Sequence, residues 1–296
     1  MKRVLVTGAS GFTGRYVVRL LLDRGYDVYS MGASGIDGER VVKASLEDKS
    51  SLSSVVRDVR PQGIVHLAAL SFVGHGVAED FYRVNTLGTL NLLEALDELD
   101  PKPSRIILAS SANVYGTPAV ERIDESLCPA PVNHYGTSKL SMEHLVSAQF
   151  GHLPVTITRP FNYTGPGQNE RFLIPKIVSH FVRRESVIEL GNLDVSRDFS
   201  DVRDVASYYV QLLEADKSVS PVNLCSGQAY SISQVLDMMA EIAGYRIEVR
   251  VNPLFVRANE IPFLVGDSRR LHGVIGNTPI VPMSQTLQDM YSEGEL

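Results

Sequence analysis

Tyr135 and Lys139 are the pair of side chains in this 296-residue sequence best suited to move a proton. Four residues apart on a helix, they would lie on the same face. A tyrosine with its ordinary pKa of about 10 exchanges protons poorly at neutral pH, but a neighbouring ammonium group lowers that pKa because it favours the phenolate. The pair could then exchange a proton with an oxygen atom while hydride moves at the adjoining carbon. Chance alone can also place such a pair on a solvated helix face.

Ser111 directly follows an apolar run at 105–110 that is typical of a buried parallel strand. The carboxyl ends of such strands line the ligand crevice of a doubly wound sheet. A hydroxyl group at that position can hydrogen-bond the same reacting oxygen. Ser111 is therefore a candidate to act together with Tyr135 and Lys139.

Three glycines, Gly8, Gly11 and Gly14, follow an apolar run at 4–6 and open a helical pattern at 16–22. The first permits a tight turn, the second lets the backbone approach a pyrophosphate, and the third lets the helix pack on the sheet. The free N–H groups and positive dipole at the start of the helix would bind the phosphates. This strand–loop–helix context predicts a dinucleotide site. The alternative is a glycine-rich turn with no ligand.

The end of the second expected strand, 26–31, bears on which dinucleotide is bound. NAD sites usually carry an acidic residue there, and this chain has none up to Ser34, although Asp37 and Glu39 follow and could compensate. Ser34 and Arg15 could face a 2′-phosphate, while Arg15 fits a solvated helix position equally well. Because the missing acid removes a repulsion, we favour NADP as the cofactor, with NAD as the other possibility.

Short apolar runs alternate with helical patterns through the first 160 residues. Such alternation favours an α/β protein, here a doubly wound parallel sheet of Rossmann type. The expected strands are 4–6, 26–31, 40–44, 63–67, 105–110 and 155–159, and the expected helices are 16–22, 46–59, 81–99 and 135–150. Beyond residue 160 the pattern loosens, with helical stretches at 175–184, 202–214 and 231–243. We therefore expect a Rossmann domain at 1–160 and a smaller, mainly substrate-binding part at 161–296.

Composition limits the partners of the chain. Its net charge of −6 gives no reason to expect a nucleic-acid or anionic-membrane surface, although backbone dipoles can still bind a small anion. Cys128 and Cys225 stand in no metal-binding pattern, so we expect free thiols and no metal. Since no apolar run approaches the length of a membrane span, we also expect no membrane partner and a cytoplasmic location.

Five stretches, in order, resemble the extended short-chain dehydrogenase/reductase family over nearly the whole chain. They are the glycine loop, HLAA at 66–69, NTLGT at 85–89, the serine strand and the Tyr-Lys pair. The resemblance implies catalytic roles for Ser111, Tyr135 and Lys139, with Lys139 also touching the nicotinamide ribose. Asn85 either orders this region or has a structural role in its helix. The implied cofactor-binding residues are Gly8, Ser10, Gly11, Phe12, Gly14, Ser34, Leu46, Leu67, Ala68, Ala69, Tyr135 and Lys139.

Later stretches resemble the nucleotide-sugar branch that contains GDP-mannose dehydratases and GDP-6-deoxy-hexulose reductases. They are 159–168, 191–193, 197–204, 257–262 and 264–267. The resemblance implies a substrate site made by Asn162, Arg197, Arg257 and Glu260, the last two at the nucleotide end. Guanidinium groups bind phosphate with two parallel hydrogen bonds, and a carboxylate can accept from both ribose hydroxyls. The alternative for each arginine is a structural ion pair with one of three carboxylates, Asp198, Asp201 or Glu260.

The residue type at position 113 indicates which reaction of this branch the chain can catalyse, and here it is Asn113. Dehydratases carry a carboxylate at this position, and a neutral amide cannot act as a general base. We therefore favour a reduction over 4,6-dehydration. In this reaction NAD(P)H would reduce the 4-keto group of a nucleotide-linked 4-keto-6-deoxy sugar in deoxysugar biosynthesis, and the nucleotide we expect is GDP. A nucleotide-sugar 4-epimerase is the main alternative, and a non-catalytic NADP-binding sensor is the most distant one. The helices at 81–99 and 135–150 could form a homodimer or simply cover the sheet.

Overall fold

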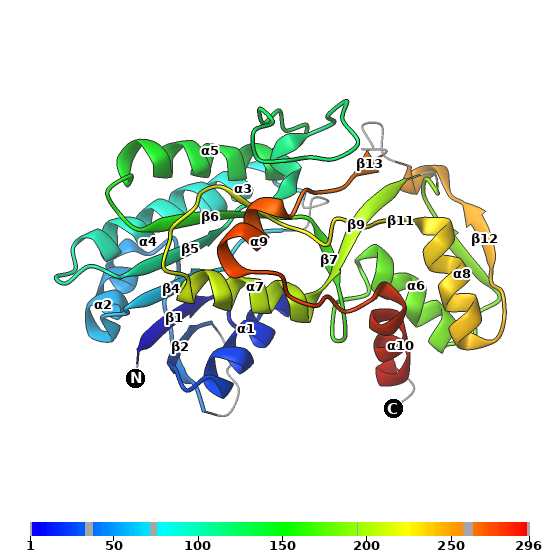
Figure 1. The fold of residues 1–296 in the computed structure, drawn as a ribbon, viewed down its shortest axis with the longest axis horizontal. Helices are drawn as coiled ribbons and strands as arrows, with labels where there is room; N and C mark the ends of the chain where they lie inside the picture. Colours follow the sequence, from blue (N-terminus) through cyan, green and yellow to red (C-terminus); the bar gives the residue numbers. More distant parts are fainter. Residues whose placement is uncertain (1, 33–37, 72–75, 194, 257–262, 295–296) are drawn as a thin grey trace.

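The computed structural model describes residues 2–32, 38–71, 76–193, 195–256 and 263–294, and a seven-stranded sheet lies at its centre (Figure 1). The strand order is β10-β6-β5-β4-β1-β2-β3, and every neighbouring pair is parallel. This is the Rossmann order, which reverses direction between β1 and β4, so the expected α/β fold class is confirmed. The strands are β1 Arg3–Thr7, β2 Asp27–Met31, β3 Arg40–Val42, β4 Gly63–His66, β5 Arg105–Ala109, β6 Val155–Pro160 and β10 Val222–Leu224.

Helices cover both faces of the sheet, as Figure 1 shows. On one face lie α1 Phe12–Asp23 and α7 Val202–Glu214, and on the other α2 Lys49–Val59, α4 Gly88–Asp97 and α5 His134–Gln149. Strand β1 shows how the sequence serves both layers. Val4 and Val6 pack into the first core and Leu5 into the second, because successive side chains of a strand point to opposite faces. A sheet covered on both sides therefore reads as an unbroken apolar run.

The helix expected at 81–99 is interrupted, and the expectation of one continuous helix is wrong. The chain forms a short helix α3 (Ala78–Phe81), then a π-helical segment η1 (Tyr82–Leu87), and only then α4. Asn85 and Thr86 inside η1 are buried, and both bond to atoms outside the helix. These bonds favour a wider turn, and such π-helical turns often occur at functional sites.

The second part of the molecule has its own core and lies beside the sheet, at the right of Figure 1. It contains short strands that pair across long stretches of sequence, with β9 beside β7, β11 and β13, and β8 beside β12. Its elements are β7 Asn162–Thr164, α6 Leu173–Val182, β8 Val187–Leu190, β9 Ser196–Asp201, β11 Ala229–Ser231, α8 Ile232–Ala243, β12 Glu248–Val251, η3 Pro253–Phe255, β13 Phe263–Leu264 and α10 Met283–Gly294.

The chain crosses between the two parts several times, and not only at residue 160. After β9 it returns to the sheet as α7, whose apolar side chains pack with those of α1, and then as β10, which pairs with β6. Helix α9 (Arg269–Ile275) follows β13 and also packs on the Rossmann side through Leu271. The assignment of residues 161–296 mainly to substrate binding remains a prediction.

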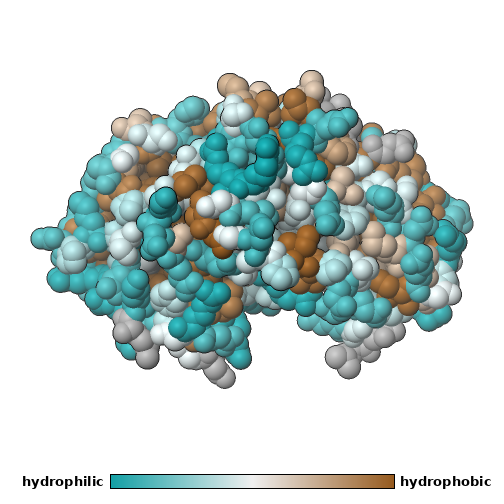
Figure 2. Space-filling model, in the orientation of Figure 1, coloured by the Kyte–Doolittle hydropathy of each residue, from teal (hydrophilic) through white to brown (hydrophobic). Residues whose placement is uncertain are grey.

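Figure 2 shows hydrophilic residues over most of the viewed face, with hydrophobic residues scattered between them. No helix in the described ranges is both long enough and apolar enough to cross a membrane. Both cysteines are free, Cys225 in the interior and Cys128 at the surface.

Asp198 on β9 joins the second part to the sheet. Its carboxylate is fully buried and accepts four hydrogen bonds, from the Ser226 backbone N (2.9 Å), the Ser226 hydroxyl (2.7 Å), the Gly227 N (2.8 Å) and the Gly266 N (3.4 Å). Residues 226–227 directly follow β10, so one carboxylate fixes three segments that are far apart in sequence. Burial raises the pKa of this carboxyl, and the hydrogen bonds act in the opposite direction.

We expect Asp198→Ala to lower the free energy of unfolding by about 3 kcal/mol or more, because several buried donors lose their only charged acceptor. Urea unfolding measures this change. The control is Asp237→Ala, which removes an exposed surface ion pair with Arg246 and should cost about 0–1 kcal/mol. Equal losses in the two variants would show that Asp198 has no special structural role.

Candidate dinucleotide and catalytic site

The glycine loop between β1 and α1 has the shape of a phosphate cradle. Gly8 has a φ of +69°, and a side chain on it would come within 2.7 Å of the Ala68 backbone nitrogen. A side chain on Gly14 would come within 2.2 Å of the Gly8 carbonyl oxygen. Gly11 donates its N–H to that same carbonyl at 3.0 Å and occupies the N-cap of α1. These contacts permit only glycine and leave the loop backbone open to an anion.

The other predicted cofactor residues in the described ranges surround this loop. Ser10 lies at the exposed tip of the loop, whereas Leu67, Ala68 and Ala69 follow β4 at the same edge of the sheet. Leu46 is buried behind them, and its carbonyl accepts from Asn91 at 2.8 Å. Ser34 lies outside the described residues. The residues present therefore fit a dinucleotide.

The first turn of α1 is also bound to the second part of the molecule. The ring of Phe12 stacks on that of Tyr163, with centroids 6.1 Å apart and planes within 9°. The Thr13 and Tyr163 hydroxyls are hydrogen-bonded at 2.7 Å. Arg15 donates to the Gly167 carbonyl at 3.0 Å and is exposed on α1, so it holds the solvated helix position that was one of the two expectations, while its contact to a 2′-phosphate remains a prediction. The sequence could not show that a turn 152 residues away holds this side chain.

The catalytic residues predicted from sequence lie at the carboxyl ends of the central strands. Tyr135 and Lys139 are on α5, both buried, and the Lys139 ammonium donates to the carbonyl of Ala109 at 2.7 Å. Ala109 ends β5, and Ser111 follows two residues later at the N-cap of a 3₁₀ turn, η2 (Ala112–Tyr115). Ser111 lies close enough to Tyr135 to lower the pKa of that phenol. The structure thus brings these three side chains to one place.

Burial controls the protonation of this group. It raises the pKa of Tyr135 to about 12, while Ser111 acts in the opposite direction. The expected lowering of the tyrosine pKa is therefore not found, because desolvation of the phenol is the largest influence and Lys139 is not among the groups that shift this pKa. Burial likewise lowers the pKa of Lys139 to about 8, and Glu143 partly counters that shift. At neutral pH the phenol therefore keeps its proton and can only donate it, beside a lysine that is mostly charged.

Glu143 continues the polar face of α5 one turn beyond Lys139. Its carboxylate accepts from Arg159 on β6 at 2.6 and 3.1 Å, and from the Ser110 hydroxyl at 2.5 Å. Arg159 also donates to the Tyr115 hydroxyl at 3.0 Å. Arg159 begins one of the stretches that resemble the nucleotide-sugar branch, and its guanidinium is used in this buried pair. The i, i+4, i+8 spacing from Tyr135 was the available signal for Glu143.

Asn85 connects the segment after β4 to the catalytic helix. Its side chain accepts from the Leu70 N at 2.9 Å, donates to the Leu70 carbonyl at 3.0 Å and donates to the Ser138 hydroxyl at 3.1 Å. Thr86 adds a bond to the Ser138 carbonyl at 2.9 Å. Of the two roles considered for Asn85, these contacts support the ordering role. The π-helical turn of η1 turns both residues toward α5.

His66, at the end of β4, was not assigned a role from the sequence. It is buried, with Nδ1 2.6 Å from the Thr7 hydroxyl and Nε2 2.9 Å from the Thr89 hydroxyl. Thr89 donates to the Asn85 carbonyl at 2.8 Å, so its oxygen must accept from Nε2–H, and Nδ1 accepts from Thr7. Desolvation lowers the pKa of His66 to about 3. A histidine at the end of a wholly apolar strand was the signal that sequence reasoning overlooked.

The substrate residues predicted from sequence are only partly within the described ranges. Asn162 is half-buried on β7, and Arg197 is largely buried on β9, where it donates to the Ser196 carbonyl at 3.0 Å. Two proposed partners of Arg197 are engaged elsewhere, since Asp198 binds backbone N–H groups and Asp201 pairs with Arg203 at 2.7 Å. Arg257 and Glu260 lie outside the described residues.

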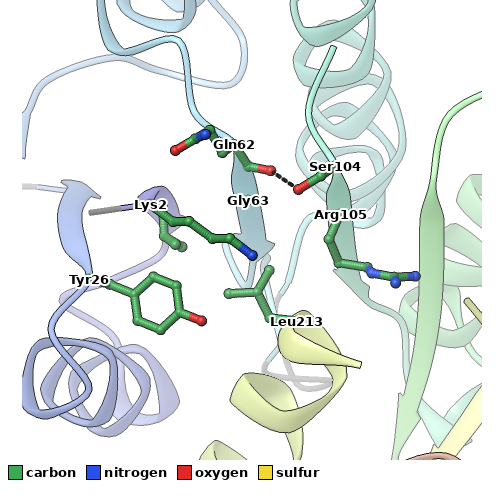
Figure 3. Close-up of a pocket in the computed structure, with 8 residues that line it drawn as sticks. Lys2, Tyr26, Gln62, Gly63, Ser104, Arg105 and Leu213 are labelled. Atoms are coloured by element: carbon green, nitrogen blue, oxygen red, sulfur yellow. Dashed lines mark hydrogen bonds between the residues drawn. The ribbon is translucent and has the colours of Figure 1, made fainter. Parts of the chain in front are cut away.

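The opposite edge of the sheet carries a small hollow, shown in Figure 3. It lies at the amino ends of β1, β4 and β5, where Lys2, Tyr26 and Leu213 face one another (Figure 3). The Ser104 hydroxyl is already bonded to the Gln62 carbonyl at 2.9 Å. Within the described part of the chain, no cluster of three or more His, Cys, Asp or Glu residues could hold a metal. The carboxyl edge is therefore the candidate site.

Comparison with known proteins agrees with this geometry. The sequence matches the family model described as GDP-mannose 4,6 dehydratase over residues 5–290. It is 39% identical to the GDP-6-deoxy-D-talose 4-dehydrogenase of Aggregatibacter actinomycetemcomitans, over 98% of this chain and 97% of that protein. It is 32% identical to the GDP-6-deoxy-D-mannose reductase of Pseudomonas aeruginosa, over 99% of this chain and 97% of that protein.

Solved structures share the whole fold. A Burkholderia cenocepacia protein matches with a TM-score of 0.93 at 43% identity, over 99% of this chain and 98% of that one. RMD from Pseudomonas aeruginosa, complexed with NADPH, matches with a TM-score of 0.87 at 31% sequence identity, over 100% of this chain and 99% of that one. The UDP-glucose 4-epimerase of Thermus thermophilus, in complex with NAD, matches with a TM-score of 0.86 at 29% sequence identity, over 99% of this chain and 98% of that one. Both forms of the dinucleotide thus occur among similar structures.

The burial of neutral His66 predicts a pH dependence of stability. In the unfolded chain His66 binds a proton below its ordinary pKa of about 6.5, whereas in the folded chain it stays neutral down to about pH 3. Stability is therefore lost as pH falls through this window, by about 2 kcal/mol between pH 7.5 and pH 5. Urea unfolding of wild type and His66→Asn at both pH values isolates the effect, because other titrations cancel in the difference. A difference between the two proteins that does not change with pH would contradict the assignment.

Proposed function

This chain belongs to the GDP-mannose 4,6-dehydratase family of extended short-chain dehydrogenases/reductases, and is therefore an enzyme. From this premise we propose that it reduces the 4-keto group of a GDP-linked 4-keto-6-deoxy sugar with NADPH. One observation carries the proposal: Tyr135 and Lys139 are buried together on α5, with Lys139 bonded to the last residue of β5 and Ser111 following that strand. Burial raises the pKa of Tyr135, so its phenol can give a proton to a developing alkoxide. The reducing direction rests on NADPH as the proposed source of hydride.

Asn113 supports reduction over dehydration. It lies two residues after Ser111, at the position where dehydratases of this branch carry a carboxylate, and its side chain contacts the Ser111 hydroxyl at 3.2 Å. A neutral amide at this place cannot remove a proton from the sugar. Both curated relatives reported above are named for oxidation or reduction of a GDP-6-deoxy sugar.

The reaction balances with the groups of this site. The bound dinucleotide would supply the hydride that reduces carbon 4. Tyr135 gives its proton to oxygen 4, so that the ketone becomes a secondary alcohol. Ser111 hydrogen-bonds the same oxygen, and the Lys139 ammonium stabilises the negative charge that forms on Tyr135. The backbone of the Gly8–Gly14 loop would hold the pyrophosphate.

Substrate binding is proposed for the second part of the molecule. We assign Arg197, which is largely buried on β9, to the diphosphate, and Asn162 on β7 to the sugar side. Arg257 and Glu260 complete the proposed site on the basis of sequence alone. The planar guanidinium group of Arg197 could form two parallel hydrogen bonds with a phosphate, which supports a nucleotide-diphosphate sugar as the substrate.

A 4-epimerase is the second candidate, because the similar structures include a UDP-glucose 4-epimerase with NAD. An epimerase would keep its cofactor and return the hydride to the other face of a rotated 4-keto intermediate. It would interconvert two nucleotide sugars without net oxidation of NADPH, and this difference separates the two reactions.

Homodimer formation and a cytoplasmic location remain proposals. Leu87, at the end of η1, lies within the 81–99 segment expected to pair, and Val77 precedes that segment at the start of α3. Val77 is 51% exposed and Leu87 is 55% exposed, which suits burial against a second copy.

We expect purified protein to oxidise NADPH, in preference to NADH, with GDP-4-keto-6-deoxy sugars as substrates, and GDP to inhibit better than UDP or dTDP. Arg197→Gln and Arg257→Ala should each weaken GDP binding by about 1.5–3 kcal/mol, because each removes a charge-assisted bond. Calorimetric titration measures this loss, with Arg246→Ala, an exposed ion-pair variant, as control. UDP-glucose epimerisation without NADPH oxidation would favour the second candidate, and equal affinity for GDP and UDP would remove the claim about the base.

Tyr135→Phe should reduce turnover on the order of a hundredfold or more while NADPH affinity stays nearly unchanged. The reason is that the phenol proton is the one proposed to reach the substrate oxygen. Steady-state kinetics and cofactor titration measure the two effects separately. Tyr26→Phe is the matched control, since Tyr26 lies at the opposite edge of the sheet (Figure 3). Near-normal turnover by Tyr135→Phe would exclude this mechanism.

A further inference from the structure

We propose that Asn113 is a positioning residue that occupies both acceptor positions of the Ser111 hydroxyl and so leaves it only a proton to offer to the reacting oxygen. The inference deepens the proposed reduction and rests on it. It starts from the inventory of a hydroxyl group, which has one proton to donate and two lone pairs that accept. The orientation of that proton decides whether Ser111 can stabilise negative charge on the substrate oxygen.

Both acceptor positions of the Ser111 hydroxyl are occupied by Asn113. The oxygen accepts from the Asn113 backbone N–H at 3.1 Å and from its side-chain Nδ2 at 3.2 Å. Ser111 is itself buried. Its proton is therefore the only part of the hydroxyl that is still free to bond, and Tyr135 is near enough for Ser111 to lower its pKa.

The backbone fixes which way the Asn113 amide points. The N–H of Gly136 donates to Oδ1 of Asn133, the N-cap of α5, at 2.8 Å. Because that N–H can only donate, Oδ1 of Asn133 is fixed, and the amide presents its Nδ2 to Asn113. Nδ2 of Asn133 donates to Oδ1 of Asn113 in a long bond of 3.5 Å. The remaining Nδ2 of Asn113 must then face Ser111.

Gly136 allows this arrangement to form. It follows Tyr135 directly, and a side chain on it would come within 2.6 Å of the Asn113 carbonyl oxygen and 3.0 Å of Pro131. The η2 turn and the first turn of α5 can approach this closely only because position 136 has no side chain. The same contact that places Tyr135 thus places Asn113 over Ser111.

The chemistry explains why the direction of the hydrogen bond matters. As hydride reaches carbon 4, negative charge grows on the carbonyl oxygen, and only donors stabilise that oxygen. With its lone pairs occupied, Ser111 cannot rotate to accept, so it presents its proton to Tyr135 or to the substrate oxygen. A carboxylate at position 113 would instead accept the Ser111 proton and draw it away from the reacting oxygen.

Asn113→Asp and Asn113→Ala test the inference, because aspartate keeps the shape of asparagine but reverses its hydrogen bond. We expect Ser111→Ala to lower kcat about a hundredfold, Asn113→Asp to approach that loss, and Asn113→Ala to lower kcat less, about tenfold. The KM and the NADPH affinity should stay unchanged. In the Ser111→Ala background both Asn113 substitutions should have little further effect. Full additivity with Ser111→Ala, or an Asn113→Asp enzyme as fast as wild type, would overturn the proposal.

These kinetic comparisons of single and double variants can use any nucleotide sugar that the wild type turns over. They therefore test the inference even if the proposed base or sugar is wrong. If no such substrate is turned over, the proposed function fails, and neutron diffraction, which locates protons, decides the inference independently. We expect the Ser111 proton to point away from Asn113 in wild type and toward the carboxylate in Asn113→Asp, while the oxygen stays in place. A Ser111 proton with the same direction in both proteins would overturn the proposal without any measurement of activity.

Discussion

The burial of one polar face of α5 is the constraint on which the candidate site depends. Tyr135, Lys139 and Glu143 succeed one another at intervals of four residues, and all three are pressed against the ends of β5 and β6. An ammonium and a carboxylate removed from water are costly unless each is bonded. Lys139 is stabilised by a strand carbonyl, and Glu143 by Arg159 and Ser110. Because all these partners come from strand ends, the helix can take only one position along the sheet.

A chain of hydrogen bonds links the glycine loop to that helix. It runs from the Ala68 N–H to Thr7, through neutral His66 to Thr89, and on to the carbonyl of Asn85. The Asn85 side chain then bonds Ser138, one residue before Lys139. These bonds connect the phosphate-binding loop to the proton-donating helix through buried groups. The polar residues of β1, β4 and η1 serve this purpose, and they account for the polar ends of otherwise apolar strands.

The sequence allowed prediction of the Rossmann sheet and of the grouping of Ser111, Tyr135 and Lys139, because those depend on local periodicity and on motif spacing. Contacts between residues far apart in sequence could not be predicted. The capture of Arg15 by Gly167 and the pairing of β9 with three separate strands depend on residues far apart in sequence. The raised pKa of Tyr135 was also not predicted, because residue spacing alone does not show how far a side chain is buried from solvent. The π-helical turn looked like ordinary helix, since its inward polar residues fit a helical pattern equally well.

The return of the chain to the sheet after β9 affects the order in which the protein can fold during synthesis. Strand β6 is an edge strand until residues 222–224 are made, because β10 is its outer neighbour. The α1 face of the sheet likewise lacks half of its cover until α7 has emerged, with Val205 and Tyr209 among the missing core side chains. Roughly the first three quarters of the polypeptide must therefore be synthesised before the nucleotide-binding sheet can close. Until then, an unpaired edge and an uncovered apolar face are exposed, and both favour association with other chains.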